Sequence, residues 1–127
     1  MSIRYKNGYL VMPIVFALLL MSCVTMSLYD AGNLKKGMTA EEVKAVLPVA
    51  PKYSFPVETE ESNPQVIVVN TYILSTGSYA SNYYLAFRGD HLFFWGYPHE
   101  FARSSDPLIN DVGEKANAML KKIAEAK

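Results

Sequence analysis

The chain has 127 residues, with twelve lysines and arginines against twelve aspartates and glutamates, two histidines and one cysteine. This balance gives no basic footprint for nucleic acid. A single cysteine cannot close an internal disulfide. The length suits one domain with one modest hydrophobic core.

The start of the chain has the composition of an export signal. Arg4 and Lys6 come first with no acidic residue, and an apolar run follows from Tyr9 to Met21. A basic start, a short apolar run and a small residue before the cut are the parts of a secretory signal. The run is shorter than the roughly 20 residues that span a bilayer. A cleaved leader is therefore favoured over the alternative, an uncleaved membrane anchor.

The only cysteine lies two residues after this run. The stretch Leu20-Met21-Ser22-Cys23 resembles the lipobox of bacterial lipoproteins, in which the cysteine thiol receives a diacylglycerol and the leader is removed. The resemblance implies a signal peptide over residues 1–22, lipid on Cys23, and a lipidated tether over residues 23–33. Val24 follows the cysteine instead of aspartate. By resemblance to the sorting rule of Gram-negative lipoproteins, this implies a protein anchored in the outer membrane and facing the periplasm.

Residues 34–48 predict a turn followed by a helix. Thr39 is a good N-cap, and Glu42 three residues later completes a capping box. Met38 and Val43 are spaced to form the hydrophobic staple around that cap. Pro48 ends the helix, because the residue before a proline is pushed out of the helical region.

The middle of the chain predicts strands. Residues 49–64 contain three prolines and an acidic cluster, which indicates a loop or an irregular edge segment. Strands are expected at about 66–74, 82–88 and 91–97, with Gly89-Asp90 as a type II′ hairpin turn. A final helix is expected from Pro107 to Ala126, capped by Asp106. The expected fold over residues 34–127 is α+β: helices packed on a three-stranded antiparallel sheet, plus a C-terminal helix.

The hairpin turn sorts the strand residues into two faces. It pairs Phe87 with Leu92, Leu85 with Phe94 and Tyr84 with Trp95, so the first four lie on an apolar core face. The other face is aromatic, and its candidate partner-binding residues are Tyr84, Phe93 and Trp95, with Tyr97 nearby. Two alternatives remain: an exposed binding surface, or a second core layer under the last helix. The second is slightly favoured, because the apolar stripe of that helix needs a surface to cover.

The sequence offers little for catalysis. His91 and His99 lack the spacing of a helical metal pair, and no dense set of four ligands is present. No serine lies in a nucleophile-elbow pattern, and no glycine-rich phosphate loop occurs. We therefore expect no catalytic residue, no metal and no cofactor. A small hydrolase or ligand carrier would need a polar pocket that the sequence does not indicate.

Two segments carry a family resemblance. Residues 34–47, with Gly37-Met38-Thr39 before an acidic helix start, and residues 83–92, with tyrosines, Phe87, Asp90 and Leu92, resemble the small protein A (BamE-like) family of outer-membrane lipoproteins. The resemblance covers roughly residues 28–97 and implies two helices on a three-stranded sheet, a layout similar to the β-lactamase-inhibitor protein repeat. It implies a non-enzymatic envelope protein that binds or assembles a protein partner, in outer-membrane assembly or maintenance. The alternative is an inhibitor-type module that binds an envelope enzyme or toxin.

Overall fold

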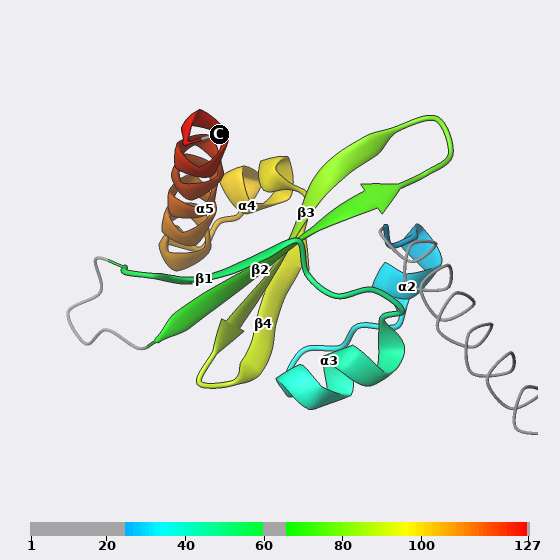
Figure 1. Cartoon of the computed structure of the whole chain (residues 1–127). Helices are drawn as coiled ribbons and strands as arrows, with labels where there is room; N and C mark the ends of the chain where they lie inside the picture. Colours follow the sequence, from blue (N-terminus) through cyan, green and yellow to red (C-terminus); the bar gives the residue numbers. More distant parts are fainter. Residues whose placement is uncertain (1–24, 60–65, 127) are drawn as a thin grey trace, which may run out of the picture.

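The computed structural model describes residues 25–59 and 66–126 (Figure 1). The strands form one antiparallel sheet in the order β1-β2-β3-β4, so the α+β class is confirmed but the sheet has four strands instead of three. In chain order the elements are α2 (Leu28–Gly32), α3 (Ala40–Val46), β1 (Tyr53–Val57), β2 (Ile67–Ser75), β3 (Ala80–Arg88), β4 (His91–Gly96), α4 (Pro98–Arg103) and α5 (Pro107–Glu125).

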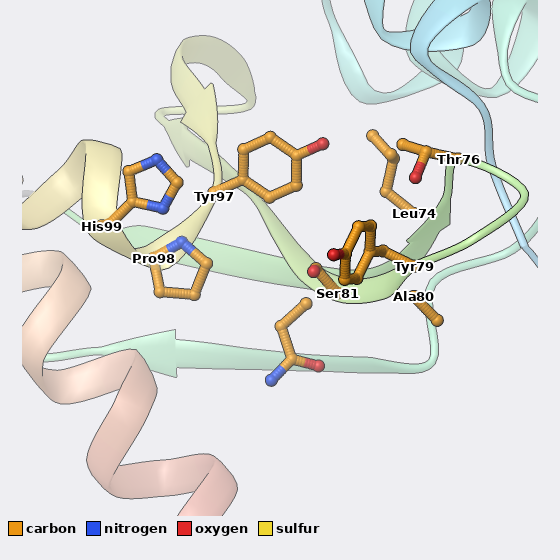
Figure 2. Close-up of a pocket in the computed structure, with 9 residues that line it drawn as sticks. Leu74, Thr76, Tyr79, Ala80, Ser81, Tyr97, Pro98 and His99 are labelled. Carbon is orange, nitrogen blue, oxygen red and sulfur yellow. The ribbon is translucent and has the colours of Figure 1, made fainter.

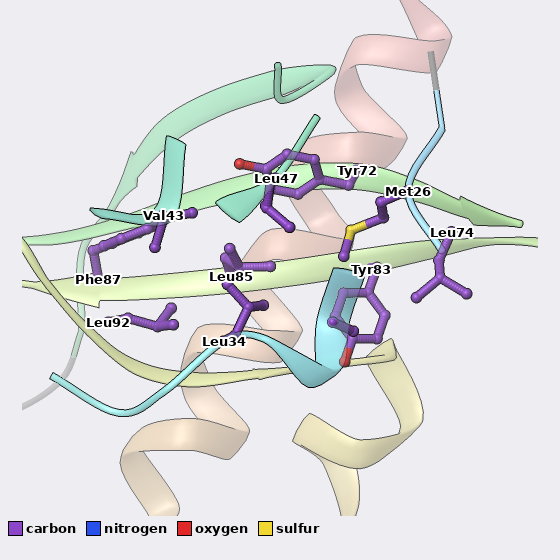
Figure 3. Packing of buried hydrophobic residues seen from close by; sticks show 11 residues of the cluster. Met26, Leu34, Val43, Leu47, Tyr72, Leu74, Tyr83, Leu85, Phe87 and Leu92 are labelled. Carbon is purple, nitrogen blue, oxygen red and sulfur yellow. The ribbon is translucent and has the colours of Figure 1, made fainter. Parts of the chain in front are cut away.

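The sheet is covered on both faces, with α2 and α3 on one side and α4 and α5 on the other (Figure 1). Because side chains alternate along a strand, each central strand contributes to two cores. The N-terminal core lies under α2 and α3 and consists of Met26, Ala31, Leu34, Val43, Leu47, Tyr72, Leu74, Tyr83, Leu85, Phe87 and Leu92 (Figure 3). The C-terminal core lies under α4 and α5 and consists of Phe55, Val57, Ile67, Val69, Tyr84, Ala86, Phe101, Leu108, Val112 and Ala116.

The additional strand, β1, falls in the segment expected to be a loop or an irregular edge. It is an edge strand, in which Pro56 lies opposite Val68 of β2. An edge position tolerates proline because one side of the strand makes no ladder hydrogen bonds. Phe55 and Val57 are buried, whereas Ser54 and Pro56 are exposed. This alternation of apolar and exposed residues is a strand signal that the prolines concealed.

The turn between β3 and β4 differs from the expected type. Gly89 and Asp90 have φ angles of 55° and 68°. Positive φ at both central residues defines a type I′ turn, so the predicted type II′ turn is wrong. Both types fit a two-residue hairpin, and the pairs next to the turn, Arg88 with His91 and Phe87 with Leu92, are as predicted.

A β-bulge then changes the register along β4. The shift occurs between Ala86 and Phe87, and from there Ala86 pairs with Phe94 and Leu85 with Trp95. An extra residue on one strand of a pair reverses the alternation of its side chains beyond that point. The predicted pairs of Leu85 with Phe94 and Tyr84 with Trp95 are therefore wrong, and Tyr84 lies opposite Gly96.

The predicted helix starts are confirmed. The Glu42 backbone N–H donates to Thr39 Oγ1 and the Thr39 N–H donates to Glu42 Oε1, both at 3.2 Å. Helix α3 ends at Val46, two residues before Pro48. Helix α5 begins at Pro107 with Asp106 as its cap, whose Oδ1 accepts from the Leu108 N–H at 2.9 Å.

Part of the segment expected to act as a tether is packed onto the sheet. Met26 is 1% exposed, its N–H donates to Ile73 O, and its carbonyl accepts from the Ser75 N–H, both at 2.9 Å. Helix α2 follows at once, with Ser27 and Asp30 as its capping box. The apolar Met26 side chain drives this docking by filling the N-terminal core, so the fold begins before residue 34.

Candidate functional site

The predicted partner-binding residues do not form one surface. Tyr84 is 1% exposed and belongs to the C-terminal core, and Phe93 packs against the same core. Trp95 and Tyr97 pack against the N-terminal core on the opposite face. The expected shared face of Tyr84, Phe93 and Trp95 is therefore wrong, because the bulge turns Trp95 over. The favoured alternative, a second core layer under the last helix, is confirmed for Tyr84.

Tyr84 connects the sheet to the C-terminal helices. Its hydroxyl donates to Asn117 Oδ1 of α5 at 2.6 Å, and its ring meets the Phe101 ring of α4 edge-on, with centroids 5.6 Å apart. Burial raises the pKa of Tyr84 to about 12. Phe93 is half-buried, and the Arg88 guanidinium lies over its ring at 4.9 Å. Tyr84 has the contacts of a structural residue.

Tyr97 joins the two faces at the end of β4. Its ring meets Tyr83 edge-on, with centroids 5.1 Å apart, and stacks on His99 at 5.5 Å with an interplanar angle of 9°. The pKa of Tyr83 is raised to about 12, mainly by burial and further by electrostatic interaction with Glu100 and Tyr97. Tyr97 itself is half-buried, and its N–H donates to Glu100 Oε1 at 2.9 Å, which begins α4. This short helix was not predicted from the sequence.

An open groove of about 690 Å³ adjoins Tyr97 (Figure 2). One wall is the β2–β3 hairpin and the other is the junction of β4 and α4. The groove is lined by Leu74, Thr76, Tyr79, Ala80, Ser81, Asn82, Tyr97, Pro98 and His99. The polar side-chain groups among these nine described residues are hydroxyls, one amide and one imidazole, and none of the nine carries a carboxylate, an ammonium or a guanidinium group.

The floor of the groove is an open strand edge. The ladder between β3 and β4 ends at Tyr84 and Gly96, whereas β3 extends back to Ala80. Pro98, which begins α4, carries the chain out of the sheet at this point. Within the part of the chain that the structure describes, no strand pairs with residues 80–83 on the side away from β2.

The hydrogen bonds of β2, the other strand of the hairpin, show which backbone groups of β3 point into the groove. Ile73 and Ser75 use their main-chain groups to bind Met26, so these groups point away from β3. In an antiparallel ladder, two directly opposed residues either bond each other or both point outward. Their partners in β3, Asn82 and Ala80, therefore point away from β2 and into the groove.

Most of the groove residues were not predicted from the sequence. Tyr79 is 76% exposed at the hairpin tip; an aromatic residue directly after a glycine- and serine-rich turn was the available signal. His99 is exposed, and its ring stacks on that of Tyr97. Cys23 lies outside the described residues. Over residues 25–59 and 66–126, no group of three or more His, Cys, Asp or Glu residues could hold a metal ion.

No family model, curated protein or solved structure matches this chain. None of the helices among the described residues is long and apolar enough to cross a membrane.

Proposed function

We propose that the protein is a non-enzymatic, lipid-anchored protein of the bacterial outer membrane that binds an extended segment of a partner protein. The observation that supports this proposal best is the open edge of β3 in the groove beside Tyr97. The resemblance to the small protein A family suggests that the bound partner takes part in outer-membrane assembly or maintenance.

The chemistry of the groove favours an extended polypeptide as ligand. A strand laid beside Ala80 and Asn82 would continue the line of β4 and satisfy main-chain groups that point into the groove. In this mode of recognition, main-chain hydrogen bonds give affinity and pockets for alternate side chains give specificity. Tyr97 provides aromatic surface for such side chains, and the uncharged lining favours apolar or neutral ones.

The partner is best sought in membranes that retain the lipid anchor. We expect affinity purification of the wild-type protein to co-purify a discrete partner, and Asn82→Pro to lose it. Proline removes the one N–H that points into the groove at this position, and an open edge tolerates its ring. Asn82→Ala is the matched control, because it removes the side chain but keeps the N–H.

Comparing the two variants distinguishes recognition through the β3 backbone from recognition through side chains. If the partner is lost with Asn82→Pro and kept with Asn82→Ala, while both variants unfold at the wild-type midpoint, binding by strand addition is supported. If Asn82→Pro folds normally and retains the full set of partners, the groove is not the binding site. An enzyme or toxin as the captured partner would favour the inhibitor-type function.

The proposed lipid anchor on Cys23 can be tested separately. Cys23→Ser removes the thiol that the lipid would modify, so we expect a soluble or uncleaved species in place of a membrane-anchored mature protein. Unchanged anchoring together with normal leader removal would contradict the lipoprotein assignment.

A further inference from the structure

The chain enters the fold at one end of the sheet, where it is firmly attached. Met26 is held by its two backbone hydrogen bonds to Ile73 and Ser75, and its side chain lies beside Leu74 in the N-terminal core (Figure 3). Ser75 pairs with Ala80 across the β2–β3 hairpin. Met26 is therefore fixed close to the tip of that hairpin, where α2 also lies (Figure 1).

The distance from this fixed point to the proposed lipid is short. Met26 is the third residue after Cys23. A fully extended chain spans at most about 3.6 Å per residue, so the two Cα atoms lie within about 11 Å of each other. If Cys23 carries the lipid, as the proposed function requires, this end of the domain is held at the bilayer surface.

The same end displays apolar side chains. Across the described residues, four large apolar side chains are strongly exposed: Leu28 at 58%, Tyr29 at 80%, Val66 at 71% and Tyr79 at 76%. Leu28 and Tyr29 open α2 just after Met26, and Tyr79 directly precedes Ala80 at the hairpin tip. Val66 lies at the opposite end of the sheet, where its carbonyl accepts from the Gly89 N–H at 3.4 Å.

Charge at this end is low. Residues 74–82 contain no charged side chain, and residues 25–33 contain only Asp30, which is occupied in capping α2. Tyrosine suits a membrane–water interface, because its ring is apolar and its hydroxyl can stay hydrated. This composition favours contact with the neutral interface of a bilayer over attraction to anionic lipids.

We propose that α2 and the tip of the β2–β3 hairpin lie against the bilayer, with Leu28, Tyr29 and Tyr79 in its interfacial region. The nine residues of β3 then run away from the membrane, and at about 3.3 Å each they place the β3–β4 turn roughly 30 Å further out. The groove beside Ala80 and Asn82 opens close to the lipid surface. A partner segment that emerges from the membrane would therefore meet it directly.

A second cysteine can report this orientation, because the chain has only one cysteine and lipid would block its thiol. Ser78→Cys places a fluorescent label at the exposed hairpin tip. Glu41→Cys places it at the far end, where the neighbouring Thr39 bridges to His91. The lipidated proteins are reconstituted in phosphatidylcholine vesicles that contain lipids spin-labelled at the headgroup. We expect several-fold stronger quenching at residue 78 than at residue 41.

The contribution of the apolar side chains is tested in the Ser78→Cys protein. Replacing Leu28, Tyr29 and Tyr79 by serine should reduce the quenching clearly, whereas Val66→Ser, the matched exposed site at the other end, should not. Equal quenching at residues 78 and 41, or no effect of the triple replacement, in a protein that floats with the vesicles would overturn this orientation alone. A protein that does not float with the vesicles would overturn the proposed anchor and this orientation together.

Discussion

Replacing Gly113 by alanine is expected to destabilise the protein, although alanine is the better helix former. Gly113 lies inside α5, and a Cβ added there would lie 2.6 Å from the Cβ of Phe101 in α4. Phe101 is fully buried, and Asn110 of α5 donates to its carbonyl at 2.7 Å. The two helices would have to move apart, which would disturb both the C-terminal core and this hydrogen bond.

The expected change in the free energy of unfolding is the balance of two opposing effects. Alanine gains about 1 kcal/mol over glycine in a helix interior, whereas forcing an extra methyl group into a packed core costs about 1–3 kcal/mol. The upper part of that cost applies, because the nearest atom is a Cβ, which cannot rotate away as the end of a flexible side chain can. We therefore expect the free energy of unfolding to fall by roughly 1–2 kcal/mol.

Urea unfolding followed by far-ultraviolet circular dichroism measures this change. Gly32→Ala is the matched control: Gly32 ends α2, and no atom of the described residues lies within 4 Å of a Cβ added there. Its unfolding midpoint should stay the same or rise slightly, because only the helix preference changes. A Gly113→Ala midpoint that equals or exceeds that of the wild type would refute the close approach of α4 and α5.

Three further predictions concern the core and the caps. Tyr84→Phe should lower the free energy of unfolding by about 1 kcal/mol, because it removes the hydroxyl that donates to Asn117; an unchanged urea midpoint would contradict this role. Thr39→Ala should cost about 1 kcal/mol by removing the cap of α3, which thermal unfolding would show, and no loss would mean that the cap is dispensable. Tyr83 and Tyr84 have pKa values raised to about 12 from 10, so the unfolded chain loses these protons first. The free energy of unfolding should stay constant below pH 10 and fall as the pH rises from about 10 to 12, with a smaller loss in Tyr84→Phe. Absorbance measures tyrosinate formation and circular dichroism measures unfolding. If the two signals change independently with pH, this link between deprotonation and unfolding is contradicted.

The features that could be predicted from the sequence are those that depend on neighbouring residues. The α3 capping box, the stop at Pro48, the three apolar strands and the start of α5 at Pro107 follow from local backbone preferences and side-chain spacing. These interactions join residues a few positions apart, so a single sequence contains all the information they need.

Only the tertiary structure decided where the aromatic residues point. The bulge in β4 turns Trp95 to the face opposite Tyr84, and no local preference marks that one extra residue. β1 exists because its burial against β2 outweighs the weak strand preference of a proline-containing segment. Met26 is docked by a strand some fifty residues later in the chain. The groove arises in the same way, since β4 ends before its partner β3 does, and the relative ends of two strands depend on how the whole sheet packs.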